Sequence, residues 1–121
     1  MSYTALILDE GSHKKLVDSI DIPENWEVVA HHMTINMGSP DKGPVEGLVG
    51  QEAPLTVSTQ AQDDLVMAVG VESPIPSSNE IKHITVAVNR EAGGKPFFSN
   101  RLTDWQPVPP ITLKGIVTHV E

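Results

Sequence analysis

The sequence contains no cysteine, which excludes disulfide bonds and metal sites built from thiolates. Aromatic residues are also few: two Trp, two Phe and one Tyr. Aliphatic residues and methionine must therefore fill the hydrophobic core. Because disulfide-free chains are typical of reducing compartments, we expect a cytoplasmic protein.

Basic residues are scarce, with 8 Lys and Arg against 16 Asp and Glu and a formal net charge of −8. Binding to a long nucleic-acid duplex requires clustered Lys and Arg, so this composition argues against such a partner. The acidic composition does not argue against a small phosphate-bearing ligand bound in a local pocket. No apolar run reaches the ~18 residues of a membrane span, and the N-terminus lacks a basic segment followed by an apolar one, so we expect no membrane partner.

The length of 121 residues is close to the commonest domain size, and we expect residues 1–121 to form one domain. Hydrophobic patterning predicts about seven strands, one clear helix and one weaker helix, which indicates an α+β fold with mostly antiparallel pairing. The predicted strands are 3–8, 26–30, 30–37, 55–59, 65–71, 82–88 and 111–118, and the pattern leaves open whether 26–37 is one long strand or two joined by a bend. The first predicted helix starts at Asp9–Ser12 and ends before Pro23. The second, weaker helix covers residues 97–102.

Turn-forming residues separate these elements. Residues 38–44 predict a loop, and residues 45–50 have only a weak tendency to form a helical turn because they include two glycines. Segments 55–59 and 65–71 are expected to pair as a hairpin. Pro107, Pro109 and Pro110 predict an extended connector before the last strand.

A His-x-Thr unit occurs twice on predicted strands, as His32-Met33-Thr34 and as His83-Ile84-Thr85. Since residues two apart on a strand share a face, each unit presents an imidazole and a hydroxyl on one side. The opposite side of each strand is apolar. Each strand is therefore expected to face a core on one side and a ligand on the other.

Two imidazoles that face one cleft can divide proton transfer, one acting as a base and the other as an acid. A threonine hydroxyl on the same strand face can donate a hydrogen bond to a non-bridging phosphate oxygen. Two adjacent His-x-Thr strands would thus surround a phosphodiester with a base, an acid and two donors. This scheme needs no metal and no cofactor, and it leaves open which histidine is the acid.

The paired motifs in "HHMTI" and "HITVA" resemble the 2H phosphoesterases, including the RNA ligase-like and cyclic phosphodiesterase group. The resemblance implies catalytic roles for His32 and His83 and phosphate binding by Thr34 and Thr85. It implies a two-lobed fold with pseudo-twofold symmetry around a central cleft. It also implies hydrolysis or opening of a phosphodiester in RNA ends, in a 2′,3′-cyclic nucleotide, or in a 2′-5′ linked or cyclic oligonucleotide. The lack of a dense basic patch favours a small nucleotide substrate.

Three further residues are candidates for substrate binding. Tyr3 opens a strand and can direct its hydroxyl into the cleft, Asn36 shares the face of His32, and Trp105 can stack on a base. Phe97 is a similar stacking candidate, and packing under the proline connector is the commoner use of both Trp105 and Phe97. His31 is expected on the opposite face from His32, packed inside.

Two alternatives to the phosphodiesterase remain. One is a protein of the same fold that sequesters a nucleotide or an RNA end without cutting it. The other is a zinc enzyme that uses His31, His32 and His83. Alternation along the strand argues against a site shared by the two adjacent histidines.

Overall fold

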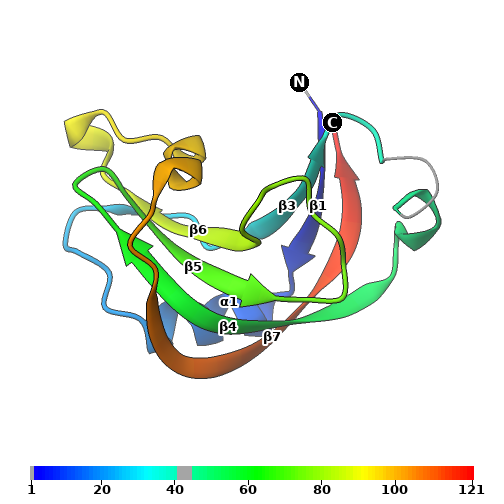
Figure 1. Cartoon of the computed structure of the whole chain (residues 1–121), viewed down its shortest axis with the longest axis horizontal. Helices are drawn as coiled ribbons and strands as arrows, with labels where there is room; N and C mark the ends of the chain where they lie inside the picture. Colours follow the sequence, from blue (N-terminus) through cyan, green and yellow to red (C-terminus); the bar gives the residue numbers. More distant parts are fainter. Residues whose placement is uncertain (1, 41–44) are drawn as a thin grey trace.

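A computed structural model of the chain describes residues 2–40 and 45–121. Seven strands form one sheet (Figure 1). They are β1 (Tyr3–Leu8), β2 (Glu27–Val28), β3 (His32–Met37), β4 (Glu52–Gln62), β5 (Val66–Glu72), β6 (His83–Val88) and β7 (Gln106–Val120). The helical segments are α1 (Glu10–Ser19) and three short 3-10 helices, η1 (Glu46–Leu48), η2 (Arg90–Ala92) and η3 (Pro96–Arg101).

The sheet closes on itself. Its strand order is β2-β6-β3-β1-β7-β4-β5, and β5 also pairs with β6, so six strands form a closed barrel with β2 added beside β6. The strand pairs are antiparallel, including the expected hairpin of β4 and β5. The predicted α+β class with mostly antiparallel strands is therefore confirmed. In the described part of the chain, no helix is long and apolar enough to cross a membrane.

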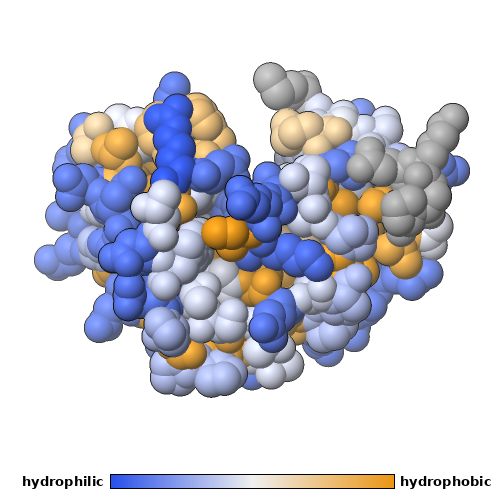
Figure 2. All heavy atoms as spheres, viewed as in Figure 1, coloured by the Kyte–Doolittle hydropathy of each residue, from blue (hydrophilic) through white to orange (hydrophobic). Residues whose placement is uncertain are grey.

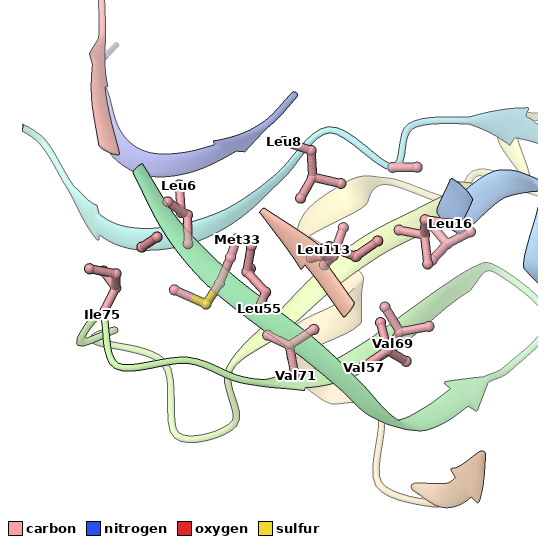
Figure 3. Close-up of a cluster of buried hydrophobic side chains, with 14 of the residues drawn as sticks. Leu6, Leu8, Leu16, Met33, Leu55, Val57, Val69, Val71, Ile75 and Leu113 are labelled. Atoms are coloured by element: carbon pink, nitrogen blue, oxygen red, sulfur yellow. The ribbon is translucent and has the colours of Figure 1, made fainter. Parts of the chain in front are cut away.

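Aliphatic side chains and methionine fill the inside of this barrel (Figure 3). The fully buried members include Leu6, Met33, Leu55, Val57, Val69, Ile84 and Leu113. This agrees with the scarcity of aromatic residues, because no aromatic side chain belongs to the buried set of the described residues. Leu16 of α1 joins the same cluster, so the helix adds its apolar side to the core of the barrel.

The start of α1 follows the predicted capping chemistry. Asp9 is the N-cap, and its Oδ1 accepts a hydrogen bond from the Ser12 amide at 2.7 Å. The Ser12 hydroxyl in turn accepts the amide of Lys114 at 2.9 Å. These two bonds join the helix end to β7.

The structure decides one open question and corrects one predicted segment. Residues 26–37 form two strands and not one, because β2 and β3 are separated by Ala30, whose φ of 42° turns the chain. The predicted proline connector is wrong, since Pro107, Pro109 and Pro110 lie within β7. Proline fits an extended strand, and the register of β4 against β7 shifts at this end of the pairing. Residues 41–44 of the predicted loop lie outside the described residues.

Gly93 and Gly94 direct the chain into η3. Gly93 has a φ of 89°, and the amide of Gly94 donates to the carbonyl of Asn89 at 2.9 Å. A Cβ atom at Gly94 would overlap the carbonyl oxygen of Leu65, so the backbone can approach this closely only without a side chain. The two glycines therefore serve to place η3 against the barrel.

We expect Gly94→Ala to lower the free energy of unfolding by about 1–3 kcal/mol, because the backbone must shift to accommodate the methyl group. Gly47→Ala is the matched control, since a Cβ there meets open space, and its effect should stay within about 0.5 kcal/mol. Urea unfolding of both variants measures the difference. Equal stability of the two variants would contradict this role of Gly94.

Candidate functional site

The two motif strands are neighbours in the barrel wall. Met33 of β3 lies opposite Ile84 of β6 in an antiparallel pair, and both side chains are completely buried in the core. Because adjacent residues on a strand point to opposite faces, the flanking His and Thr residues of both motifs lie on the outer face of the barrel. One cross-strand pair thus brings the two motifs together.

The outer face of β3 and β6 carries a pocket of about 300 Å³, here called the motif pocket. It is lined by all four motif residues, His32, Thr34, His83 and Thr85, and by Tyr3, Val29, Met37, Ser78, Asn79, Pro96, Phe97, Ser99 and Asn100. Figure 2 shows a notch in the upper outline of the molecule. In the same view in Figure 1, β3 and β6 lie below the notch and η3 lies to its left.

Two segments build the walls of the motif pocket. The first is η3, which supplies Phe97 and Ser99. The second is the loop before β6, which is attached to β3: the Ser77 hydroxyl donates to the carbonyl of Thr34 at 2.7 Å, and the Ser78 amide donates to the carbonyl of Ile35 at 2.7 Å. The pocket is therefore formed by segments distant in sequence.

His32 lies in this pocket as a neutral imidazole at neutral pH. Its pKa falls from 6.5 to about 4, mainly because burial disfavours the charged ring and in smaller part because His31 and His83 lie nearby. Its ring also lies 5.0 Å from the ring of Tyr3, measured between centroids. Both His32 and His83 line this pocket.

The prediction for His31 is wrong. His31 is exposed, and its Nδ1 lies 2.9 Å from Nδ1 of His32, so one ring nitrogen donates to the other. Strand alternation does not apply here, because β3 begins only at His32 and Ala30 turns the chain just before it. The argument that these histidines face opposite sides therefore fails. Among the described residues, no group of three or more potential metal ligands is brought together.

His83 is 8 % exposed, and both of its ring nitrogens have partners. Nδ1 lies 2.7 Å from the carbonyl oxygen of Ile81, which can only accept, so Nδ1 carries a proton and donates. Nε2 lies 3.0 Å from the hydroxyl of Ser99. Nε2 is therefore the ring nitrogen that can either donate to this hydroxyl or accept from it.

Ser99 connects the second motif to η3. Its hydroxyl lies 2.9 Å from the Thr85 hydroxyl and 2.8 Å from the carbonyl oxygen of Pro96, and the residue is 2 % exposed. When His83 is protonated, Nε2 donates to Ser99 and Ser99 donates to Pro96. When His83 is neutral, Ser99 donates to Nε2 instead. In either state Thr85 can donate to Ser99, so the network accommodates both protonation states.

The sequence provides no local signal for Ser99. It lies outside both motifs, in a segment predicted only as a short helix. Its contact with His83 arises because η3 folds back over β6. The sequence also gives no local signal for Ser78 and Asn79. Their place in the pocket depends on how a loop rich in Pro and Ser folds over β3.

Of the remaining candidate residues, two line the motif pocket and two do not. Tyr3 lines the motif pocket, and Phe97 lies at its edge with 55 % of its surface exposed. Asn36 is not brought to the pocket: it is 4 % exposed and its amide donates to the carbonyls of Met37 and Ser39. Trp105 lies outside the motif pocket, beside His83, with 6.2 Å between ring centroids.

In comparisons with known proteins, no family model, no curated protein and no solved structure matches this chain. The resemblance to the 2H phosphoesterases therefore rests on the two motifs.

The lowered pKa of His32 predicts an acid-dependent loss of stability. As pH falls from 6.5 towards 4, the unfolded chain binds a proton at His32 and the folded chain does not, so folding is favoured less. The shift from 6.5 to about 4 corresponds to about 3 kcal/mol over this window. We expect His32→Gln to remove most of this dependence. Urea unfolding of both proteins from pH 7.5 to pH 4.5 measures it, and parallel pH profiles would contradict the burial of an uncharged His32.

Proposed function

We propose that the protein is a metal-independent phosphodiesterase of the 2H type that hydrolyses or opens a phosphodiester in a small nucleotide. The candidate substrates are a 2′,3′-cyclic phosphate, a 2′-5′ linked oligonucleotide and a cyclic oligonucleotide. The observation that carries this proposal is the meeting of both His-x-Thr motifs in one pocket. A cytoplasmic location and a role in RNA processing remain predictions.

The charge of the pocket favours a diester. None of the described residues that line it is Lys or Arg, so positive charge must come from a protonated histidine. A phosphodiester carries one negative charge, whereas a phosphate monoester approaches two at neutral pH. One imidazolium balances the first and not the second.

His32 is the proposed general base. With a pKa near 4, it is neutral at pH 7 and has a nitrogen lone pair. Its Nδ1 is shared with His31, which leaves Nε2 for the pocket. In the tautomer with the proton on Nδ1, Nε2 accepts a proton from the attacking water or hydroxyl while the new P–O bond forms.

His83 is the proposed general acid. Its Nδ1 is held by the Ile81 carbonyl, and a proton on Nε2 passes to the oxygen of the leaving group as the P–O bond breaks. Thr34 has no side-chain hydrogen bond among the described residues and donates to a non-bridging oxygen. The Thr85 hydroxyl contacts Ser99 and the carbonyl of Pro96, so it must exchange one of these partners for the phosphate.

The proposal includes the two-lobed, pseudo-symmetric arrangement of the 2H family. The support for this symmetry comes from the two motif strands alone. Because Met33 pairs with Ile84 across antiparallel strands, a two-fold rotation about that pair exchanges His32 with His83 and Thr34 with Thr85. The motif pocket would then be the central cleft.

We expect His32→Ala and His83→Ala each to abolish turnover with the fold retained, because each removes one of the two proton-transfer groups. Thr34→Ala and Thr85→Ala should lower kcat by on the order of 10²–10³, the loss typical of one transition-state donor. Chromatography of products from linear, 2′,3′-cyclic, 2′-5′ linked and cyclic di- and trinucleotides measures turnover.

His119→Ala is the matched control for the histidine variants, since His119 lies on β7 and does not line the motif pocket. Turnover should also persist in excess EDTA. Loss of turnover in EDTA would favour the zinc enzyme instead. Near wild-type turnover by His32→Ala on every substrate would overturn the catalytic assignment.

Ser99→Ala tests whether the network at the second motif positions His83 and Thr85. The substitution removes one partner from each of them, so we expect kcat to fall by about 10- to 100-fold, the range for displaced catalytic groups. KM should change less than threefold, because Ser99 is a positioning residue. Steady-state kinetics separate the two constants, and an unchanged kcat would contradict the role.

One observation favours the sequestering alternative. Both ring nitrogens of His83 are already hydrogen-bonded within the protein, which suits a fixed binding surface. Tight nucleotide binding with no product from any substrate would establish this alternative. It would also show that Ser99 does not release Nε2 for chemistry.

A further inference from the structure

A second cavity adjoins the motif pocket. It has a volume of about 580 Å³ and is here called the Trp105 chamber. Its lining includes Glu80, Ile81, Leu102, Thr103 and Trp105, none of which lines the motif pocket. A larger open groove of about 630 Å³ lies at the start of α1, but it is lined by no motif residue.

The two cavities share a wall. Ser78, Asn79, His83, Ser99 and Asn100 line both of them. The proposed acid, His83, therefore stands at the boundary between the cavities. A ligand whose phosphate lies at the histidines can extend from this boundary in two directions.

The charge of the Trp105 chamber favours an uncharged group over a phosphate. Glu80 is the one charged side chain among the described residues that line it, apart from the titratable His83. A carboxylate repels a phosphate and accepts hydrogen bonds from amino or hydroxyl groups. The chamber thus suits an uncharged group rich in donors.

Its other groups match a nucleoside. Trp105 offers an aromatic surface for stacking; its indole N–H already donates to the carbonyl of Leu102 at 3.2 Å, which holds the ring in place. Asn79 and Asn100 provide amide groups that can donate to and accept from a base edge or a ribose. Thr103 is exposed at the wall and adds a hydroxyl.

The edge of the motif pocket is apolar, in contrast to the polar lining of the Trp105 chamber. Phe97 from η3 and Met37 from the end of β3 are 55 % and 65 % exposed, and both line this pocket. Exposed apolar side chains at a pocket edge are a surface for another ring to cover. A first nucleobase therefore finds an apolar surface here, made by residues that do not line the Trp105 chamber.

We propose that the Trp105 chamber binds a second nucleoside, so that the substrate is a dinucleotide with an unphosphorylated nucleoside on each side of the scissile diester. This inference rests on the proposed phosphodiesterase function. It favours a 2′-5′ or 3′-5′ linked dinucleoside monophosphate over a mononucleoside 2′,3′-cyclic phosphate, which leaves the chamber empty.

The test compares two non-hydrolysable ligands that differ by one nucleoside. The first is a diadenosine analogue with a methylene group in place of the leaving oxygen, and the second carries a methyl group in place of the second adenosine. We expect the first to bind at least 10-fold more tightly. NMR titration should show shifts of the Thr103 amide and the Trp105 indole N–H with the first ligand alone.

Thr103→Tyr places a bulkier side chain at the wall of the chamber and should bring the two affinities within about threefold of each other. Thr112→Tyr is the matched control, because Thr112 is exposed on β7 and lines neither cavity; it should retain the difference.

Equal affinities in the unmodified protein, with shifts confined to the motif pocket, would overturn the second nucleoside site and leave the phosphodiesterase proposal standing. Tight binding of the two-nucleoside ligand without product from any linear, 2′,3′-cyclic, 2′-5′ linked or cyclic substrate would support the chamber and overturn the enzyme. Absence of binding by both ligands would overturn both proposals.

Discussion

The pairing of Met33 with Ile84 is the interaction on which the arrangement of this protein depends. Both side chains enter the barrel core, and their complete burial removes apolar surface from water. Because neighbouring residues alternate, this burial obliges the histidine and threonine on each side of the pair to face outwards. A shift of one residue in either strand would place imidazoles in the core and leave the apolar residues outside, which burial strongly opposes.

Two histidines of similar sequence context acquire different environments through tertiary structure. His32 loses water and gains a second imidazole at Nδ1, and its pKa falls to about 4. His83 gains a backbone carbonyl at one nitrogen and the Ser99 hydroxyl at the other. Such a difference is what a division between base and acid requires. It arises from η3 and from the turn at Ala30, not from the motifs.

The walls of the site come from short irregular segments held on a rigid barrel. η3 is placed by the close approach of Gly94 to Leu65, and the loop before β6 is bonded to β3. These attachments bring Phe97, Ser99 and Asn79 to the motif strands. The barrel supplies the precise spacing of the motifs, and the attached segments decide the shape and polarity of the space above them.

The sequence by itself determined the approximate places of the strands, apart from the proline segment that begins β7, together with the capped helix at Asp9 and the outward face of each motif, because these follow from local periodicity and from the apolar residues at 33 and 84. The repeated His-x-Thr motif also indicated that four residues act together: His32, Thr34, His83 and Thr85. Tertiary structure alone decided that the sheet closes into a barrel, that His31 contacts His32, that Asn36 is buried away from the pocket, and that Ser99 joins His83 to Thr85. Each of these depends on contacts between residues distant in sequence or on a single backbone turn, and neither leaves a periodic signal in the chain.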